Sequence, residues 1–117
     1  MAIIIKTTRP NALLKTIRDG IEDGTIRTWE EDEEGDFTHI TSDGQWYNKA
    51  WFRPFVKRGE IRFGLIGRER YNMTRSIYAV YHGRFTQMLL EHCHEFYNYV
   101  TSSSEKEPED LFDWNEE

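Results

Sequence analysis

The sequence predicts an α+β domain in which two α-helices cover one face of an antiparallel β-sheet of about five strands, forming a two-layer sandwich. Apolar residues recur at helical spacing in two segments, one near each end of the chain. Between these segments, short runs rich in aromatic and β-branched residues alternate with turn residues, as in successive hairpins. The length of 117 residues suits a single domain with one hydrophobic core.

The first half of the chain is predicted to form a strand, a helix and a hairpin, in that order. Three consecutive isoleucines indicate a short buried strand at residues 2–7. Pro10 suits the first turn of a helix, and Gly24 suits its end. The apolar stripe of this helix consists of Leu13, Leu14, Ile17 and Ile21. Residues 25–31 and 36–41 are then predicted to form two strands around an acidic tip.

Three further strands are predicted in the middle of the chain. Residues 46–53 alternate between two faces, and Pro54 is expected to end this strand because proline cannot donate to a β-ladder. Gly59 marks a hairpin turn, and residues 60–66 form the return strand. Residues 76–82 are expected to form another strand, since Ile, Tyr and Val dominate this short run.

The last predicted element is a helix at residues 84–101, followed by an acidic tail. Its core stripe consists of Phe85, Met88, Leu89, Cys93, Phe96 and Val100. Three serines end the helix. The α+β domain is therefore expected to span residues 1–104, and residues 105–117 are expected to be a disordered acidic tail.

The net charge of −6 is unevenly distributed along the chain. Acidic residues are concentrated in residues 30–36 and in the tail, whereas residues 49–75 carry eight bases and two acids. Either these segments neutralise each other as neighbouring strands, or the basic segment binds a polyanion. The tail also carries three apolar residues, Leu111, Phe112 and Trp114. They would dock on a partner protein, or the tail would fold back on the basic strands of its own chain.

The stretch from His82 to Arg84 is the first candidate site. In the predicted arrangement a strand ends at His82 and a helix begins at Arg84, so free backbone N–H groups at that point can hold an anion. His82 would act as an acid or base, and Arg84 would bind a phosphate or carboxylate. The alternative is an ordinary corner in the chain.

His39 is a second candidate. It would pair with Asp36, Asp43 or His82 if folding brought them together.

A third candidate combines aromatic and basic side chains on neighbouring strands. Its candidate binding residues are Tyr47, Trp51, Arg53 and Arg62, and the wider group also includes Trp46, Lys49, Phe52, Lys57 and Arg58. Such a face suits a dimer interface, in which tryptophan, tyrosine and arginine are enriched. It also suits a small-molecule pocket, or a single-stranded nucleic acid whose bases stack on the rings and whose phosphates meet the cations.

Neither a metal nor a cofactor is expected. His92 and His94 point about 200° apart on a helix and so cannot share one metal ion. Cys93, the only cysteine, lies on an apolar stripe and leaves no partner for an internal disulfide. The apolar run at residues 3–5 is far too short for a signal sequence or a membrane span, so we expect no membrane association and a cytoplasmic location.

Two stretches, GDFTHIT (residues 35–41) and YAVYHGRFTQMLLEH (residues 78–92), resemble a family of small uncharacterised bacterial proteins. This family is of the kind carried as single gene cassettes on integrons and other mobile elements. The resemblance covers most of the chain before the tail. It implies a compact, stand-alone bacterial domain that is often dimeric, and it assigns no catalytic residue.

These observations favour a non-enzymatic binding or interaction protein that forms a homodimer through its aromatic and basic sheet face. One alternative is a nucleic-acid-associated regulator whose acidic tail competes with the nucleic acid. Another is a small-molecule-binding protein or small enzyme centred on His82 and Arg84. An enzyme is less favoured because the sequence contains neither a nucleophile elbow nor a clear pair of catalytic carboxylates.

Overall fold

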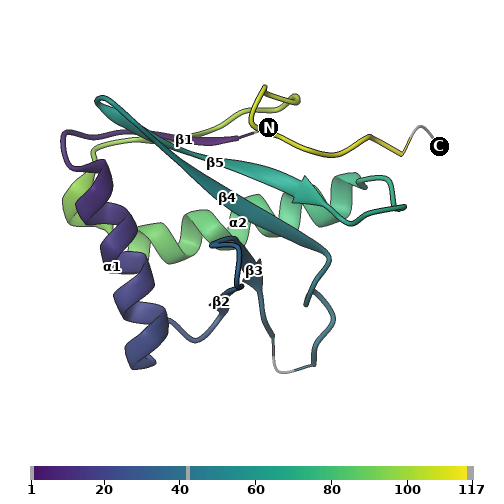
Figure 1. Cartoon of the computed structure of the whole chain (residues 1–117), viewed down its shortest axis with the longest axis horizontal. Coiled ribbons are helices and arrows are strands. Elements are labelled where there is room, and N and C mark those ends of the chain that lie inside the picture. Colours follow the sequence, from purple (N-terminus) through teal and green to yellow (C-terminus); the bar gives the residue numbers. More distant parts are fainter. Residues whose placement is uncertain (1, 42, 116–117) are drawn as a thin grey trace.

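The chain folds into one six-stranded antiparallel sheet with two α-helices, as described by a computed structural model of residues 2–41 and 43–115 (Figure 1). The elements are β1 (Ile3–Lys6), α1 (Pro10–Asp23), β2 (Trp29–Glu31), β3 (Phe37–His39), β4 (Ala50–Lys57), β5 (Glu60–Gly67), α2 (Arg75–His92), the 3-10 helix η1 (His94–Phe96) and β6 (Val100–Ser102). The strand order is β2-β3-β4-β5-β1-β6. This architecture confirms the predicted α+β class, with six strands where about five were expected.

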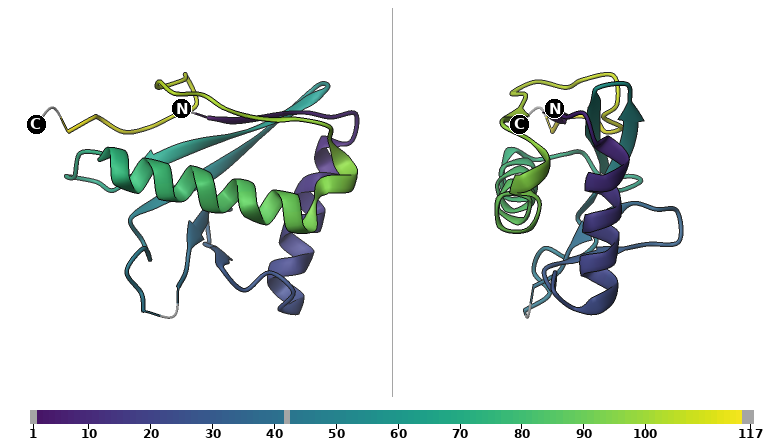
Figure 2. Two further views of the ribbon diagram at one scale, coloured as in Figure 1. Left: turned by 180° about the vertical axis from the view of Figure 1, so that it is seen from behind. Right: turned by 90° about the vertical axis from the view of Figure 1, so that its left-hand side faces the viewer.

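The long hairpin of β4 and β5 forms the centre of the sheet, and α2 crosses behind it while α1 lies at one end (Figures 1 and 2). The ring of Phe85 on α2 lies 4.6 Å from that of Phe52 and 4.8 Å from that of Phe63. All three side chains are fully buried. The core is therefore an aromatic layer between the β4–β5 hairpin and α2.

Strand β4 continues through Pro54 to Lys57, so the prediction that proline ends this strand is wrong. The pairing between β3 and β4 is at Phe37 and Phe52. Beyond that point β4 has β5 on one side only, and proline is tolerated where one side of a strand carries no ladder. The strand also begins later than predicted, because residues 46–49 form turns in which Asn48 has a φ of 56°.

The predicted strand at residues 76–82 is instead the first half of α2. Thr74 caps this helix, and its Oγ1 accepts a hydrogen bond from the backbone N–H of Ile77 at 3.1 Å. The buried residues of the helix are Tyr78, Tyr81, His82, Phe85, Met88 and Leu89. Their spacing of three and four is helical, so burial against the sheet outweighs the β-propensity of a short Ile-Tyr-Val run.

The same helix ends at His92, earlier than the predicted end at residue 101. The chain then forms η1 and strand β6. Strand β6 pairs antiparallel with β1, so that Ser102 lies opposite Ile3 and Val100 lies opposite Ile5. Strand β1 thus has a partner on each side, β5 and β6. Tertiary pairing with β1 explains why the final residues of the predicted helix become extended.

Residues 105–115 pack on the domain, whereas the sequence predicts a disordered tail from residue 105; residues 116–117 lie outside the described part of the chain. Leu111 donates its N–H to the carbonyl of Leu65, and its carbonyl accepts from the N–H of Gly67, both at 2.9 Å. Strand β1 starts opposite Phe63 and leaves this part of the β5 edge open. The C-terminal segment occupies that edge, roughly in line with β1 (Figure 1). The packed unit therefore extends beyond residue 104.

None of the helices in the described part of the chain is long and apolar enough to span a membrane.

Candidate functional site

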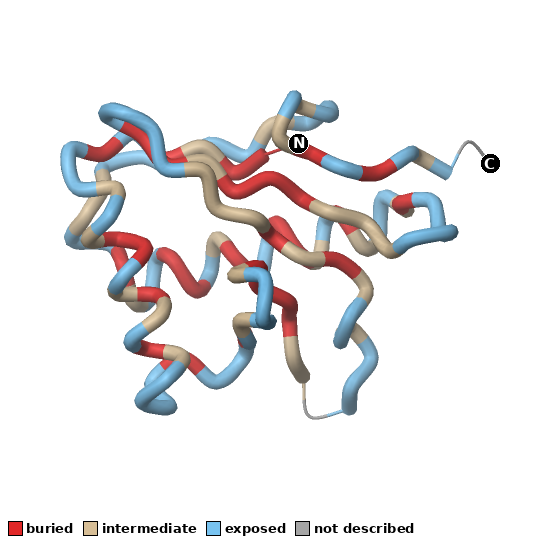
Figure 3. The backbone as a smooth tube through the Cα atoms, viewed as in Figure 1, coloured by how far each residue is buried: buried red, intermediate tan, exposed pale blue. Residues whose placement is uncertain are grey.

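The face of the sheet opposite α2 carries a row of apolar side chains. Trp51 pairs with Ile66 across β4 and β5, and Ile66 forms a parallel bridge with Leu111. Paired residues in a sheet point to the same side, and this side is opposite to buried Phe52. Leu111 is 53% exposed, while Trp51 and Ile66 are partly exposed. We call Trp51, Ile66 and Leu111 the apolar row. Figure 3 shows this side of the sheet toward the viewer.

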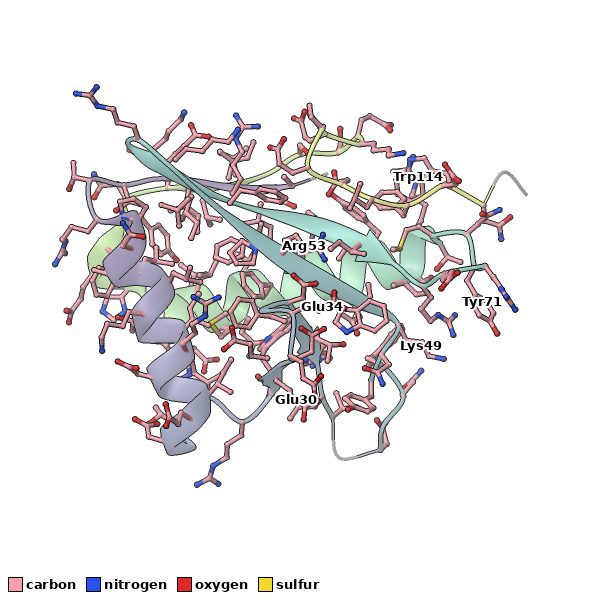
Figure 4. The ribbon with its side chains drawn as sticks, in the orientation of Figure 1. Glu30, Glu34, Lys49, Arg53, Tyr71 and Trp114 are labelled. Carbon is pink, nitrogen blue, oxygen red and sulfur yellow. The ribbon has the colours of Figure 1, made fainter. Side chains whose placement is uncertain are left out.

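Arg53 lies beside the apolar row and is bound by acidic residues from the β2–β3 hairpin. Its Nε and Nη2 donate to the two carboxylate oxygens of Asp36 at 3.0 and 2.9 Å, and Glu34 lies 3.5 Å from Nη2. Figure 4 shows Arg53 and Glu34 close together on this face. Asp36 is 3% exposed, whereas the Arg53 side chain remains 36% exposed. This cation is therefore occupied by the protein's own carboxylates.

Arg62 is neutralised in the same way. It donates from Nη1 to Glu109 of the C-terminal segment at 2.8 Å and from Nε to Glu60. Hydrogen bonds from Lys6 and Arg62 lower the pKa of Glu60 to about 2. At Arg53 and Arg62, the acidic and basic segments of the sequence therefore lie side by side and neutralise each other. A nucleic acid would have to displace these carboxylates to reach either guanidinium.

Tyr47 lies apart from the strands, in the turn that precedes β4. It is 43% exposed, and its hydroxyl group shares a hydrogen bond with Glu30, which raises the pKa of the tyrosine. The predicted aromatic and basic face therefore consists of Trp51, Arg53 and Arg62 on the sheet, with Tyr47 outside the strands.

The predicted strand-to-helix junction at His82 does not exist, because residues 75–92 form one continuous helix. His82 is buried and points into the core. Its ring stacks on Tyr78 with centroids 3.9 Å apart, and its Nδ1 shares a hydrogen bond with Ser102 of β6. No helix begins at this point, so the anion site predicted on free N–H groups is absent. His82 links α2 to β6.

His39 and Arg84, by contrast, are brought together. Both line a hollow of about 90 Å³ between β3 and α2, together with Thr28, Gln87, Met88, Glu91 and His92. His39 is 1% exposed, and its Nδ1 lies 2.8 Å from the carbonyl oxygen of Thr28. Burial lowers the pKa of His39, the hydrogen bond with Thr28 opposes this, and the charge of Arg84 lowers it further. His39 is therefore neutral at neutral pH. The predicted pairing of His39 with His82 is not formed, since His82 faces Tyr78 and Ser102.

The described residues contain no group of three or more His, Cys, Asp or Glu side chains arranged to hold a metal ion. Cys93 is fully buried, and burial raises the pKa of its thiol to about 11. The thiol is consequently protonated at physiological pH and a poor nucleophile.

The apolar residues of the C-terminal segment face in different directions. Phe112 is 8% exposed and belongs to the core. Trp114 lies 5.6 Å from Tyr78 between ring centroids, and Arg75 stacks on it at 3.8 Å. Of the three residues predicted to dock on a partner, Leu111 is the one whose side chain is more than half exposed in the structure.

Sequence reasoning named His39 and Arg84, but it missed Ile66 as a surface residue and Thr28, Gln87 and Glu91 as further residues that line the hollow. The spacing of Arg84, Gln87 and Glu91 places them on one side of a helix, which is a signal the sequence contains. The assignment of residues 76–82 to a strand separated His39 from this helical face. Thr28 offers no comparable signal, because its carbonyl takes part through the backbone.

The chain matches no protein-family model, no curated protein and no solved structure.

Proposed function

We propose that the chain is a non-enzymatic binding protein that forms a cytoplasmic homodimer through the uncovered face of its sheet. The observation that carries this proposal is the apolar row. It crosses three adjacent segments on a face that neither helix covers (Figure 2). An exposed apolar patch bordered by polar groups is characteristic of an interaction surface.

The charges that border the apolar row favour a second copy of the same chain as the partner. Arg53 with Glu34 lies on one side, and Arg62 with Glu109 lies on the other. A surface that carries both signs of charge can meet its own copy across a two-fold axis, with each cation near an anion of the other subunit. A strongly cationic surface would be repelled by its own copy.

The test is the molar mass measured by light scattering over a range of concentrations. We expect a dimer for the native chain. Leu111→Glu would place a carboxylate in the apolar row and raise the dissociation constant at least tenfold, which corresponds to about 1.4 kcal/mol. The fold should persist, because Leu111 pairs through its backbone and its side chain is 53% exposed.

Leu90→Glu is the matched control, since Leu90 is 55% exposed but lies on α2. This variant should dimerise like the native chain. A monomer mass for the native chain at every concentration would contradict the proposal. Equal dissociation constants for Leu90→Glu and Leu111→Glu would also contradict it, because the sheet face would then contribute no more to the dimer than α2 does.

A further inference from the structure

The ring of His39 has one satisfied nitrogen and one unsatisfied nitrogen. A carbonyl oxygen only accepts hydrogen bonds, so Nδ1 carries the proton that it donates to Thr28. Nε2 is then an acceptor. It is buried and has no hydrogen-bond partner among residues 2–41 and 43–115. Leaving such a group unsatisfied costs about 1–3 kcal/mol, so the site favours a ligand that donates a proton.

Arg84 is also without a partner in the described part of the chain: its guanidinium is exposed and forms neither an ion pair nor a hydrogen bond there. Arg53 and Arg62, by comparison, are each held by two carboxylates. His39 and Arg84 both line the same hollow of about 90 Å³, so one small ligand in it can contact both side chains. Arg84 thus supplies a free cation at the edge of the hollow.

The hollow is suited in size to a small polar group. Its volume of about 90 Å³ equals that of about three water molecules. Glu91 is the one acidic residue in its lining. Its carboxylate accepts a hydrogen bond from Gln87 at 3.1 Å and lies 3.6 Å from His92. These neighbours, and its 57% exposed side chain, weaken its repulsion of an anion.

We propose that this hollow binds a hydrogen phosphate group, either as free phosphate or as the end of a phosphomonoester. The phosphoryl oxygens would accept hydrogen bonds from Arg84, and a P–OH group would donate to Nε2 of His39. A protonated phosphate combines an anionic acceptor and a donor in one small group. Sulfate and acetate are fully deprotonated near neutral pH and therefore offer Nε2 no proton. This site is separate from the proposed dimer face, so either proposal can fail without the other.

The test is titration calorimetry of the full chain with sodium phosphate, with sodium sulfate at matched ionic strength, and with glycerol 3-phosphate. We expect saturable phosphate binding and at least tenfold weaker sulfate binding. Saturation by phosphate alone would assign the site to the free anion, and comparable binding of glycerol 3-phosphate would assign it to phosphomonoester ends. Either result supports the proposal. Absence of saturable binding by either phosphate compound, or equal affinity for sulfate, would overturn it.

Two variants locate the binding. Arg84→Gln should reduce phosphate affinity at least tenfold, and its exposed position should leave the fold intact. His39→Phe should remove the preference for phosphate over sulfate. Arg58→Gln is the control, because it removes one exposed charge at the β4–β5 turn, and it should leave affinity unchanged. If His39→Phe does not fold, the phosphate affinities of Arg84→Gln and Arg58→Gln are compared. An equal loss of affinity in both variants would overturn the assignment of the site.

Discussion

The backbone of Glu109 crosses Gly64 so closely that a Cβ atom on residue 64 would lie 2.3 Å from the Glu109 carbonyl oxygen. The same Cβ atom would lie 2.7 Å from the Glu109 carbonyl carbon. Real Cβ contacts are essentially never this short, so the C-terminal segment lies on β5 in this way only because residue 64 is glycine. The contact is with backbone, which cannot rotate away as a flexible side chain can.

Gly64→Ala should therefore detach or displace the C-terminal segment. We expect a loss of about 2 kcal/mol in the free energy of unfolding, the usual cost of overpacking a fitted site. Urea unfolding measures the loss, and hydrogen exchange should show lower protection of the Leu111 and Asn115 amides, which bond to Leu65 and Met73. Unchanged stability together with unchanged protection would mean that the segment does not cross residue 64.

Gly83→Ala should have the opposite effect on stability. Gly83 lies inside α2, is exposed, and has space around it, since a Cβ atom there would meet no atom within 4 Å. Alanine in an exposed helix interior is about 1 kcal/mol more favourable than glycine. Thermal unfolding should show a higher midpoint for this variant. A lower midpoint would contradict the placement of Gly83 in the interior of α2.

Phe112→Ala and Leu111→Ala form a matched pair of neighbouring substitutions. Phe112 is 8% exposed and packs in the core, so truncating it should cost about 3 kcal/mol of folding stability. Leu111 is 53% exposed, and truncating it should change the stability of the monomer by less than about 0.5 kcal/mol. Chemical denaturation at low protein concentration measures the free energy of unfolding of the two variants. Equal, small effects would indicate that the C-terminal segment is not part of the folded unit.

Glu60→Gln should destabilise the protein at neutral pH by about 2 kcal/mol, because it weakens charge-assisted hydrogen bonds from Lys6 and Arg62. The pKa of Glu60 falls from 4.5 to about 2 on folding, so its stabilising effect is fully present above pH 4.5. That effect is lost as the pH falls toward 2. The difference between the native chain and Glu60→Gln, measured by denaturant unfolding, should therefore narrow between pH 4.5 and pH 2. A difference that stays constant over this range would contradict the assignment.

Local features of the sequence were sufficient to predict the elements that short-range interactions define. The β4–β5 hairpin followed from two apolar runs around Gly59, which has a φ of 75° at the turn. Helix α1 followed from Pro10 at its start, a stripe at helical spacing, and Gly24 in a left-handed conformation at its end. Strand alternation placed Phe52 and Trp51 on opposite faces of the strand, and the structure buries Phe52 and leaves Trp51 partly exposed.

The candidate sites required information that local patterns do not contain. Residues 76–82 have strand propensity, but Thr74 caps a helix and the buried side chains pack on the sheet at helical spacing. This difference moved His82 into the core and turned Arg84 toward His39. Propensity amounts to a few tenths of a kcal/mol per residue, whereas burial of one large side chain contributes about 2 kcal/mol, so packing decides.

The sequence alone determined the α+β class, the central hairpin, and the separation of acidic from basic segments. Only the tertiary structure decided which of these segments meet. The open edge of β5 beyond the start of β1 leaves backbone N–H and C=O groups that need partners, and the C-terminal segment supplies them. Its acidic composition is typical of a disordered tail, but its hydrogen bonds, the burial of Phe112 and the Arg62–Glu109 ion pair are long-range contacts that exist only once the sheet has formed.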